Sequence, residues 1–304
     1  MALIPWYTYG LLALLGVFSC SIGDRVPESP ATDDPTPYRF WVAGHAYGHP
    51  DESIDSLGLF PPFYRELPGL AADSTVEFGV LTGDVVKWNM PERHDSVVQQ
   101  LTRFAQRTYL VPGNHDTDGG QNYDNWHAYY GLSWYSQRIH NDLYLFLDPN
   151  LDHWRINDAQ MAMLQVELAE LADVHNIFVF MHQVLWWSPE PDSAFHAFEA
   201  NSPFGRADSL NFWDEVVPMF NGLEQEVYFF AGDVGAWCRT RSLGYYQSGN
   251  IHFLTSGMGC HHKSNYLLVS VNADREVSID VKWIGRQVHD PAALGTLEDW
   301  RIVP

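Results

Sequence analysis

The sequence predicts an α/β fold in which two packed mixed β-sheets are flanked by helices. Helical patterns separate many of the earlier β-rich runs, and the later runs follow one another as hairpin strands do. This alternation favours sheets covered by helices over an all-β sandwich. Nine short runs end in polar or glycine-containing turns, and they are residues 39–43, 77–81, 108–111, 143–147, 177–181, 227–231, 251–255, 266–271 and 277–284.

The first element is an apolar segment, residues 1–20. It carries no charged side chain, because the first charged residue of the chain is Asp24. Its apolar run, residues 11–18, is shorter than the roughly 20 residues that span a bilayer. The stretch Val17-Phe18-Ser19-Cys20 resembles a bacterial lipobox, in which Cys20 receives a lipid, although no basic residue precedes it. We therefore predict a signal or lipoprotein-like segment. An ordinary cleaved signal, an uncleaved anchor and a buried first helix are the alternatives.

A linker, one domain and a short tail follow the apolar segment. Residues 21–38 hold four prolines and several acidic or small residues, so we predict a disordered, extended tether. No repeat or second linker interrupts residues 39–288, which we assign to one domain, and residues 289–304 form a tail. We expect an exported periplasmic or cell-surface protein that is lipid-anchored. It would meet a membrane only through its N-terminal lipid or anchor.

Within the domain, three helices are expected between the strands. They are residues 92–104, 158–171 and 210–220. The second is the clearest, because Met161, Leu164, Leu168 and Leu171 recur at helical spacing.

Charge and cysteine content exclude several functions. The chain has 304 residues with 17 Lys and Arg against 38 Asp and Glu, a formal charge of −21. Such a charge argues against a protein that binds a nucleic-acid duplex or an anionic membrane by electrostatics. Three cysteines cannot make a dense disulfide framework. For Cys238 and Cys260 the choice is open between a disulfide and unpaired buried thiols, and the sequence favours the thiols.

Five of the predicted strands are followed by side chains that bind metals. A glycine before such a ligand lets the chain turn sharply, and the carboxyl ends of strands are where α/β proteins place ligands. Carboxylate, imidazole and amide groups together suit Mn, Fe or Zn. The five segments are Gly44-His45-Ala46-Tyr47-Gly48-His49, Gly83-Asp84, Gly113-Asn114-His115-Asp116, Met181-His182 and Gly232-Asp233-Val234-Gly235.

With these motifs in this order, residues 39–284 resemble the calcineurin-like metallophosphoesterase superfamily. The resemblance implies a four-layer α/β/β/α sandwich that holds one or two metal ions. It implies that Asp84 bridges two metals, that Asn114 and His182 bind one of these two metals, and that His115 contacts the phosphate and protonates the leaving oxygen. A metal-activated water would then attack the phosphorus.

Two motifs depart from the family pattern. Where the family has Gly-Asp-x-His or Gly-Asp-x-Gly, this chain has His45 and Tyr47; where it has Gly-His-x-His, this chain has Asp233 and Gly235. We expect Asp84, Asn114, His182 and Asp233 to hold one metal, with His45 assisting at a second, doubtful site. Tyr47 is either a ligand that favours ferric iron, as in purple acid phosphatases, or a packed aromatic, and the sequence favours the latter.

Two further residues are candidates for substrate contact besides His115. Trp187 lies in the long segment 183–209, and such loops are often functional. His261 follows a strand and could also replace the ligand missing at Gly235. The alternatives are lid or core packing for Trp187 and an exposed loop position for His261.

Together these features predict a metal-dependent phosphoesterase acting on a small phosphorylated substrate, either a phosphomonoester or a phosphodiester. Asp84 and His115 are its expected catalytic residues. One alternative is a degenerate binding module that recognises a phosphate or a glycan without turnover. Another is a hydrolase of a different ester class.

Overall fold

The computed structural model describes residues 36–51, 57–285 and 287–303. The predicted signal segment, residues 1–20, and residues 21–35 of the predicted linker lie outside the described residues. No helix in the described ranges is both long and apolar enough to cross a membrane.

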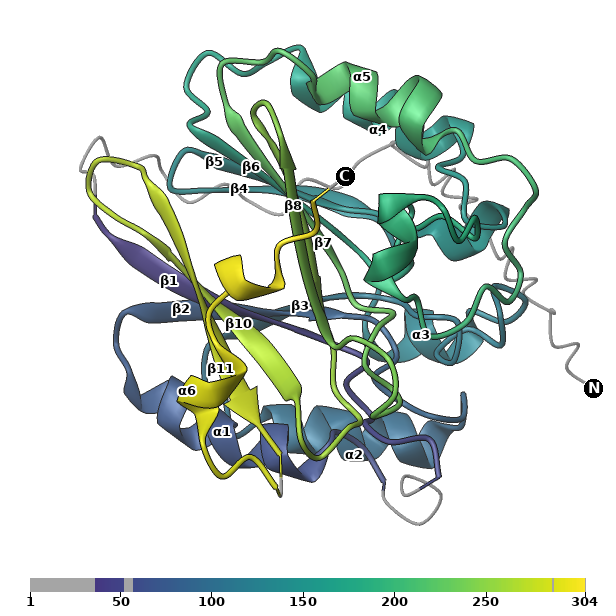
Figure 1. Ribbon diagram of the computed structural model, residues 1–304, viewed down its shortest axis with the longest axis vertical. Coiled ribbons are helices and arrows are strands. Elements are labelled where there is room, and N and C mark those ends of the chain that lie inside the picture. Colours follow the sequence, from purple (N-terminus) through teal and green to yellow (C-terminus); the bar gives the residue numbers. More distant parts are fainter. Residues whose placement is uncertain (1–35, 52–56, 286, 304) are drawn as a thin grey trace, which may run out of the picture.

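Two mixed sheets form the centre of the domain, as predicted (Figure 1). The first has the order β11-β10-β1-β2-β3, with β1, β2 and β3 parallel to one another. Its strands are β1 (Tyr38–Gly44), β2 (Val76–Thr82), β3 (Arg107–Val111), β10 (Ser264–Val271) and β11 (Val277–Ile284).

The second sheet has the order β4-β5-β6-β7-β9-β8, with β5, β6, β7 and β9 parallel. Antiparallel partners β4 and β8 close its two edges. Its strands are β4 (Tyr135–Ile139), β5 (Asp142–Phe146), β6 (Asn176–Met181), β7 (Glu226–Ala231), β8 (Leu243–Ser248) and β9 (Ile251–Ser256).

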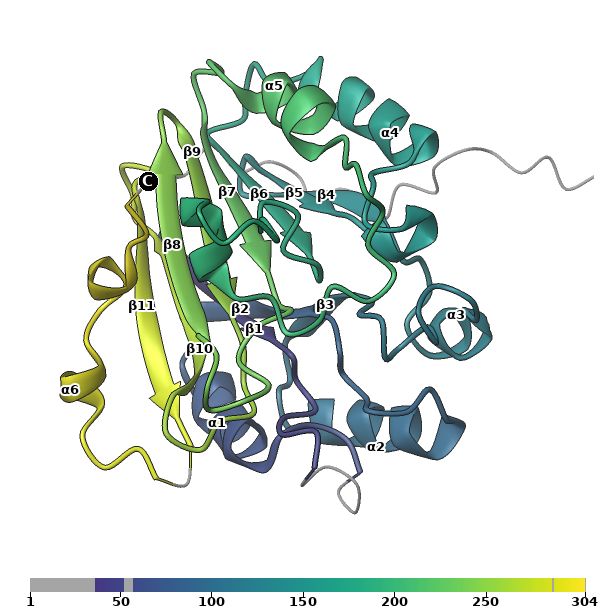
Figure 2. The same ribbon diagram turned by 45° about the vertical axis from the view of Figure 1, so that its right-hand side comes forward.

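Helices cover the outer face of each sheet, which gives four layers (Figures 1 and 2). The first sheet is covered by α1 (Pro61–Ala72) and α2 (Pro91–Leu101), and the second by α4 (Asp158–Leu168) and α5 (Val217–Phe220). A single turn of π-helix, Phe212–Val216, precedes α5, so the predicted helix 210–220 is split. The short helices α3 (Asp124–Tyr129) and α6 (Pro291–Leu294) lie in loops.

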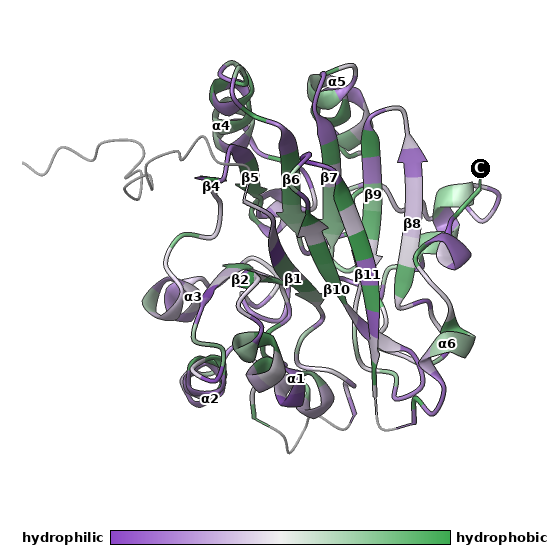
Figure 3. Ribbon diagram, turned by 90° about the vertical axis from the view of Figure 1, so that its left-hand side faces the viewer, coloured by the Kyte–Doolittle hydropathy of each residue, from purple (hydrophilic) through white to green (hydrophobic). Residues whose placement is uncertain are grey.

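The core between the two sheets is strongly aromatic. Phe40 stacks on Phe78 with ring centroids 4.9 Å apart, and Phe180 of the facing sheet meets Phe146 and Phe230 at 5.1 and 5.2 Å. Figure 3 shows that the central strands β6, β7 and β9 are hydrophobic along most of their length, whereas the edge strand β8 is largely polar. A buried parallel strand is covered on both faces, and it therefore consists of a nearly continuous run of hydrophobic residues.

All nine predicted strands are present among the described residues, but two edge strands and three α-helices were missed. β4 and β8 carry polar residues, and Gly244 interrupts β8. α1 begins with two prolines and contains Pro68, which reads as a helix breaker in sequence, although proline is tolerated in a first turn. The other missed helices, α3 and α6, are only six and four residues long.

Both ends of the described domain extend beyond their predicted limits. Tyr38, assigned above to the linker, is the first residue of β1 and is buried. The predicted tail packs against the edge strand β8, where the backbone N–H of Ile302 donates to the carbonyl of Tyr245 at 2.7 Å. Ile302 is itself buried, so at least this part of residues 289–304 belongs to the domain.

Candidate functional site

Four of the predicted ligands follow the carboxyl ends of strands that meet at one edge of the two sheets. His45 follows β1, Asp84 lies two residues after β2, and His182 and Asp233 follow β6 and β7. All four side chains are buried. Because parallel strands end at the same edge, residues far apart in sequence come together here.

Asp84 lies between two imidazole rings. The Nε2 atom of His182 is 3.4 Å from Asp84 Oδ1 and 3.8 Å from Asp233 Oδ1. On the other side, His45 Nε2 is 3.6 Å from Asp84 Oδ2. One ligand atom from each of Asp84, His182 and Asp233 lies within 4.8 Å of the others, which is close enough for a single metal ion to contact all three.

The backbone at this edge leaves no room for larger side chains. Gly83 has a φ of +81°, and a Cβ there would lie 2.6 Å from His182 Nδ1 and 2.7 Å from the backbone nitrogen of Gly113. Asp84 and His45 themselves adopt positive φ values, 53° and 48°. Non-glycine residues seldom adopt this conformation, and where they do they cluster at functional sites.

Backbone carbonyls fix the direction of both histidines. His45 Nδ1 lies 2.8 Å from the carbonyl oxygen of Met258, and His182 Nδ1 lies 2.8 Å from that of Thr82. A carbonyl only accepts a hydrogen bond, so in each ring Nδ1 donates and Nε2 is directed at Asp84. This is how proteins usually orient a histidine that binds metal.

The electrostatics of the site favour a positive charge among these groups. Burial raises the pKa of Asp84, but His182 and the neighbouring imidazoles outweigh it and hold the pKa well below the ordinary value. Burial lowers the pKa of His182, but Asp84 and Asp233 raise it to about 10. Burial dominates at Asp233 and raises its pKa to about 7. Without a metal, a proton on His182 thus takes the position of the cation.

Unpaired buried atoms show that these residues fit a metal. His182 Nε2 and Asp233 Oδ2 are buried and have no hydrogen-bond partner among the described residues. An unmet donor or acceptor of this kind is costly in a folded protein. The predicted fourth ligand, Asn114, is half-buried at the end of β3, and its side-chain amide makes no hydrogen bond within the described chain.

Tyr47 and His115 form a pair beside the metal ligands. The Tyr47 hydroxyl is 3.3 Å from His115 Nε2, and His115 Nδ1 is 2.8 Å from the carbonyl of Lys87. The Tyr47 ring packs on His45 with centroids 4.4 Å apart. Burial, together with nearby carboxylates, raises the pKa of Tyr47 far above its ordinary value. This environment disfavours a phenolate and matches the packed-aromatic interpretation, so ligation by Tyr47 stays a prediction.

The chain offers fewer ligands for a second metal than for the first. Gly235 has a φ of +76°, and a Cβ there would lie 2.7 Å from Ser242 Cβ, so a family-type histidine would be strained at this position. His45 and Asp84 Oδ2 are therefore the donors that the structure brings together on this side.

The two predicted substrate residues lie in different surroundings. Trp187 is half-buried, with its ring 6.1 Å from that of His196 and 6.0 Å from the guanidinium of Arg206. His261 is half-buried beside His49 and Phe60. Neither belongs to the group formed by Asp84, His182 and Asp233.

Two residues that position the ligands were not predicted. Asp116 accepts hydrogen bonds from the backbone N–H groups of Val85, Val86 and Gly113, and so joins the loops after β2 and β3. It was visible as the last residue of the third motif. Asn201 holds the loop of Asp233, and no local pattern marks it.

Cys238 and Cys260 form a disulfide, so the preference for unpaired thiols was wrong. The reason is topological. The cysteines lie in the loops after β7 and β9, which are adjacent parallel strands although 22 residues separate the two cysteines. Spacing in sequence does not reveal that adjacency.

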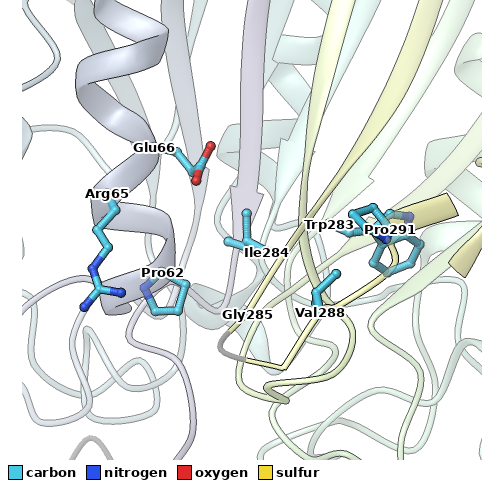
Figure 4. A pocket seen from close by; sticks show the side chains of 8 residues that line it. All are labelled: Pro62, Arg65, Glu66, Trp283, Ile284, Gly285, Val288 and Pro291. Atoms are coloured by element: carbon cyan, nitrogen blue, oxygen red, sulfur yellow. The ribbon is translucent and has the colours of Figure 1, made fainter. Parts of the chain in front are cut away.

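A separate surface pocket lies between α1 and the end of β11 (Figure 4). Glu66 and Arg65 are its charged residues, and none of the predicted site residues lines it. Its remaining lining residues are Pro62, Trp283, Ile284, Gly285, Val288 and Pro291.

Comparison with known proteins places the site within a described family. The family model of the calcineurin-like phosphoesterases matches residues 45–240, which is more than half of the chain. No curated protein matches the sequence. Among solved structures, the chain is similar to one described as GAP50, the anchor in the inner membrane complex of Plasmodium. The identity is 13%, the match covers 84% of this chain and 86% of that chain, and the TM-score is 0.49.

Proposed function

Because the chain belongs to the calcineurin-like phosphoesterase family, we propose that it is a metal-dependent hydrolase of a small phosphomonoester or phosphodiester. One observation carries the proposal. In the buried group of Asp84, His182 and Asp233, the ring nitrogen His182 Nε2 and the carboxylate oxygen Asp233 Oδ2 each lack a hydrogen-bond partner among the described residues. A divalent cation satisfies both atoms, and borderline ions such as Mn, Fe or Zn suit these donors.

The proposed roles follow from the contacts of each residue. Asp84, His182 and Asp233 would hold one metal ion with Asn114, and His45 with Asp84 Oδ2 would hold a second one more weakly. A bound ion would supply a water of lowered pKa and positive charge beside the phosphoryl oxygens.

His115 is the proposed general acid. Its Nδ1 donates to the Lys87 carbonyl, so its Nε2 is the atom that can carry a proton to the leaving oxygen. The Tyr47 hydroxyl, 3.3 Å from that Nε2, keeps the ring in this direction.

Export and membrane tethering are part of the same proposal. The disulfide between Cys238 and Cys260 supports an oxidising compartment, because cytosolic proteins seldom keep one. A Cys20→Ser variant should move the protein from the membrane fraction to the soluble exported fraction. An unchanged distribution would rule out lipidation at Cys20.

The second candidate is a binding module without turnover. The loss of a ligand at Gly235 and the turn of Tyr47 toward His115 favour it, because both weaken the second metal site. Such a module would still recognise a phosphate or a glycan.

Metal analysis coupled to an ester panel separates these candidates. Protein prepared without added metal is titrated with Mn²⁺ or Zn²⁺, then assayed with phosphate monoesters, phosphate diesters, acyl esters and sulfate esters. At least one tight equivalent with phosphate ester hydrolysis supports the proposal. Phosphate binding without hydrolysis supports the module, and hydrolysis of only acyl or sulfate esters indicates a different esterase.

A further inference from the structure

Three of the loops that build the candidate metal centre continue into a ring-bearing side chain. The loop after β1 carries His45 and then His49. The loop after β7 carries Asp233 and then Trp237. The loop after β9 carries the Met258 carbonyl that holds His45, and then His261. Each loop thus takes part in the metal centre at its base and bears a ring three or four residues further on.

These three residues, named here the rim rings, meet through His49, which contacts both of the others. The ring of His49 stands edge-on to Trp237, with centroids 5.3 Å apart and planes at 80°. The rings of His49 and His261 are nearly parallel, at 8°, with centroids 6.4 Å apart. All three residues are half-buried, so each keeps some surface in contact with solvent.

The rim rings are held in place without a ligand. The disulfide joins Cys238 and Cys260, which are the sequence neighbours of Trp237 and His261. The ring of His261 also lies 6.0 Å from buried Phe60. A surface that is fixed before binding loses less conformational entropy when a ligand binds than a mobile surface does.

The chemistry of the rim rings indicates a planar ligand. Aromatic faces bind planar rings by stacking, with little dependence on the identity of the ring. The guanidinium of Arg239 lies 5.5 Å from the Trp237 ring, which places a positive charge at the rim of an otherwise acidic protein. If the phosphoryl group of a bound ester lies at the metal centre, the group that reaches the rim rings is the leaving group of that ester.

We propose that His49, Trp237 and His261 form a subsite for a planar aromatic leaving group, so that the substrate is an aryl or nucleoside phosphate ester. This inference rests on the proposed function for the location of the phosphoryl group. An aryl ester and a nucleotide both carry a planar ring. They differ in the distance between that ring and the phosphorus atom.

Binding of non-hydrolysed ligand pairs to the disulfide-bonded, metal-loaded protein tests the subsite. Phenylphosphonate is compared with methylphosphonate, and the 5′-methylenephosphonate analogue of AMP with that of ribose 5-phosphate, by isothermal titration calorimetry. Stacking of about 1.4 kcal/mol corresponds to roughly tenfold tighter binding of the ring-bearing partner. Preference in the first pair indicates an aryl ester, and preference in the second a nucleotide.

Variants locate the effect. Trp237→Ala and His261→Ala should each reduce the preference severalfold, and Trp237→Phe should retain most of it. His262→Ala is the matched control, since His262 is the exposed neighbour of His261. If Trp237→Ala does not fold, His261→Ala and the wild-type comparison still decide the question.

The result separates this subsite from the proposed function. Equal affinities within both pairs, or a preference that survives both alanine variants, overturn the subsite even if the protein hydrolyses phosphate esters. A ring preference lost in the variants supports the subsite even if no ester is turned over, and in that case it is the hydrolase that is wrong.

Discussion

Two buried carboxylates lie at opposite ends of the strands, and their surroundings differ. Asp142 begins β5, and its carboxylate accepts hydrogen bonds from the Tyr38 hydroxyl and from Asn176, whose backbone and side-chain nitrogens are 2.8 and 3.0 Å away. Asp84 follows β2 and faces imidazole nitrogens on both of its oxygens, with the unpaired His182 Nε2 beside it. One carboxylate is satisfied within the protein, and the other lies in a group that is incomplete.

The difference shows how to tell a structural carboxylate from a binding one. Both are buried, so burial alone does not distinguish them. Hydrogen-bond donors from two sheets complete Asp142 and tie those sheets together. The Asp84 group receives the backbone N–H of His115 on Oδ1 at 3.1 Å, but it otherwise gathers donors of electron pairs, which a cation or a proton completes. Removing Asp142 should therefore cost stability, whereas removing Asp84 should cost metal binding.

The largest expected effect is that of Asp84→Asn. It removes the charge shared by both proposed metal positions, so we expect metal affinity and hydrolysis to fall roughly 1000-fold. The fold should persist, because the backbone of the loop is held mainly through Asp116. Metal titration and circular dichroism check this, and wild-type metal content in the variant would contradict the assignment.

Asp142→Ala should show the reverse pattern. It leaves the amide groups of Asn176 without their buried acceptor, so we expect the free energy of unfolding to fall by about 3 kcal/mol. The Kd for metal should stay within about twofold. Urea denaturation and metal titration measure the two quantities, and a weakened metal site in a stable variant would break the comparison.

Asn201→Ala sharpens the comparison at the metal centre. The backbone N–H of Asn201 donates to the carbonyl of Asp233, and its side-chain oxygen accepts from the N–H of Ala236, both at 2.9 Å. Losing the second bond should free the Asp233 loop and raise the Kd for metal about tenfold. Ser202→Ala is the control, because within the described ranges the Ser202 hydroxyl accepts a hydrogen bond only from the Phe204 N–H, at 3.2 Å. Equal effects of both variants would refute a role for Asn201 as a positioning residue.

The smallest effect concerns His94. Like Asp142, this buried side chain finds its hydrogen-bond partners within the protein. It contacts the Tyr130 hydroxyl and the Asn89 side chain at 3.1 Å each, and burial lowers its pKa to about 4. The unfolded chain therefore takes up the proton first as pH falls, and stability declines below pH 6.5 until about pH 4. Between pH 7.5 and about 5.8, wild type should lose about 1 kcal/mol more than His94→Gln in chemical denaturation. Parallel pH profiles would contradict this.

Much of the fold could be predicted from sequence, because buried parallel strands are continuous apolar runs. The edge strands β4 and β8 could not, since their polar residues carry no such signal. The meeting of Asp84, His182 and Asp233 followed from ligand-type residues placed after strands. The carbonyls of Thr82 and Met258 that aim the histidines could not be predicted, because any residue type supplies a carbonyl.

The pairing of β1 has a consequence for how the chain folds. β1 pairs on one side with β2 and on the other with β10, so Tyr38 faces Val271 across the sheet. One side of β1 therefore stays an open edge until residues 264–271 have left the ribosome. Contacts this distant in sequence slow folding and prolong the time for which apolar strands are exposed to aggregation. We expect chaperone supply to limit the yield of this protein more than the stability of its native state does.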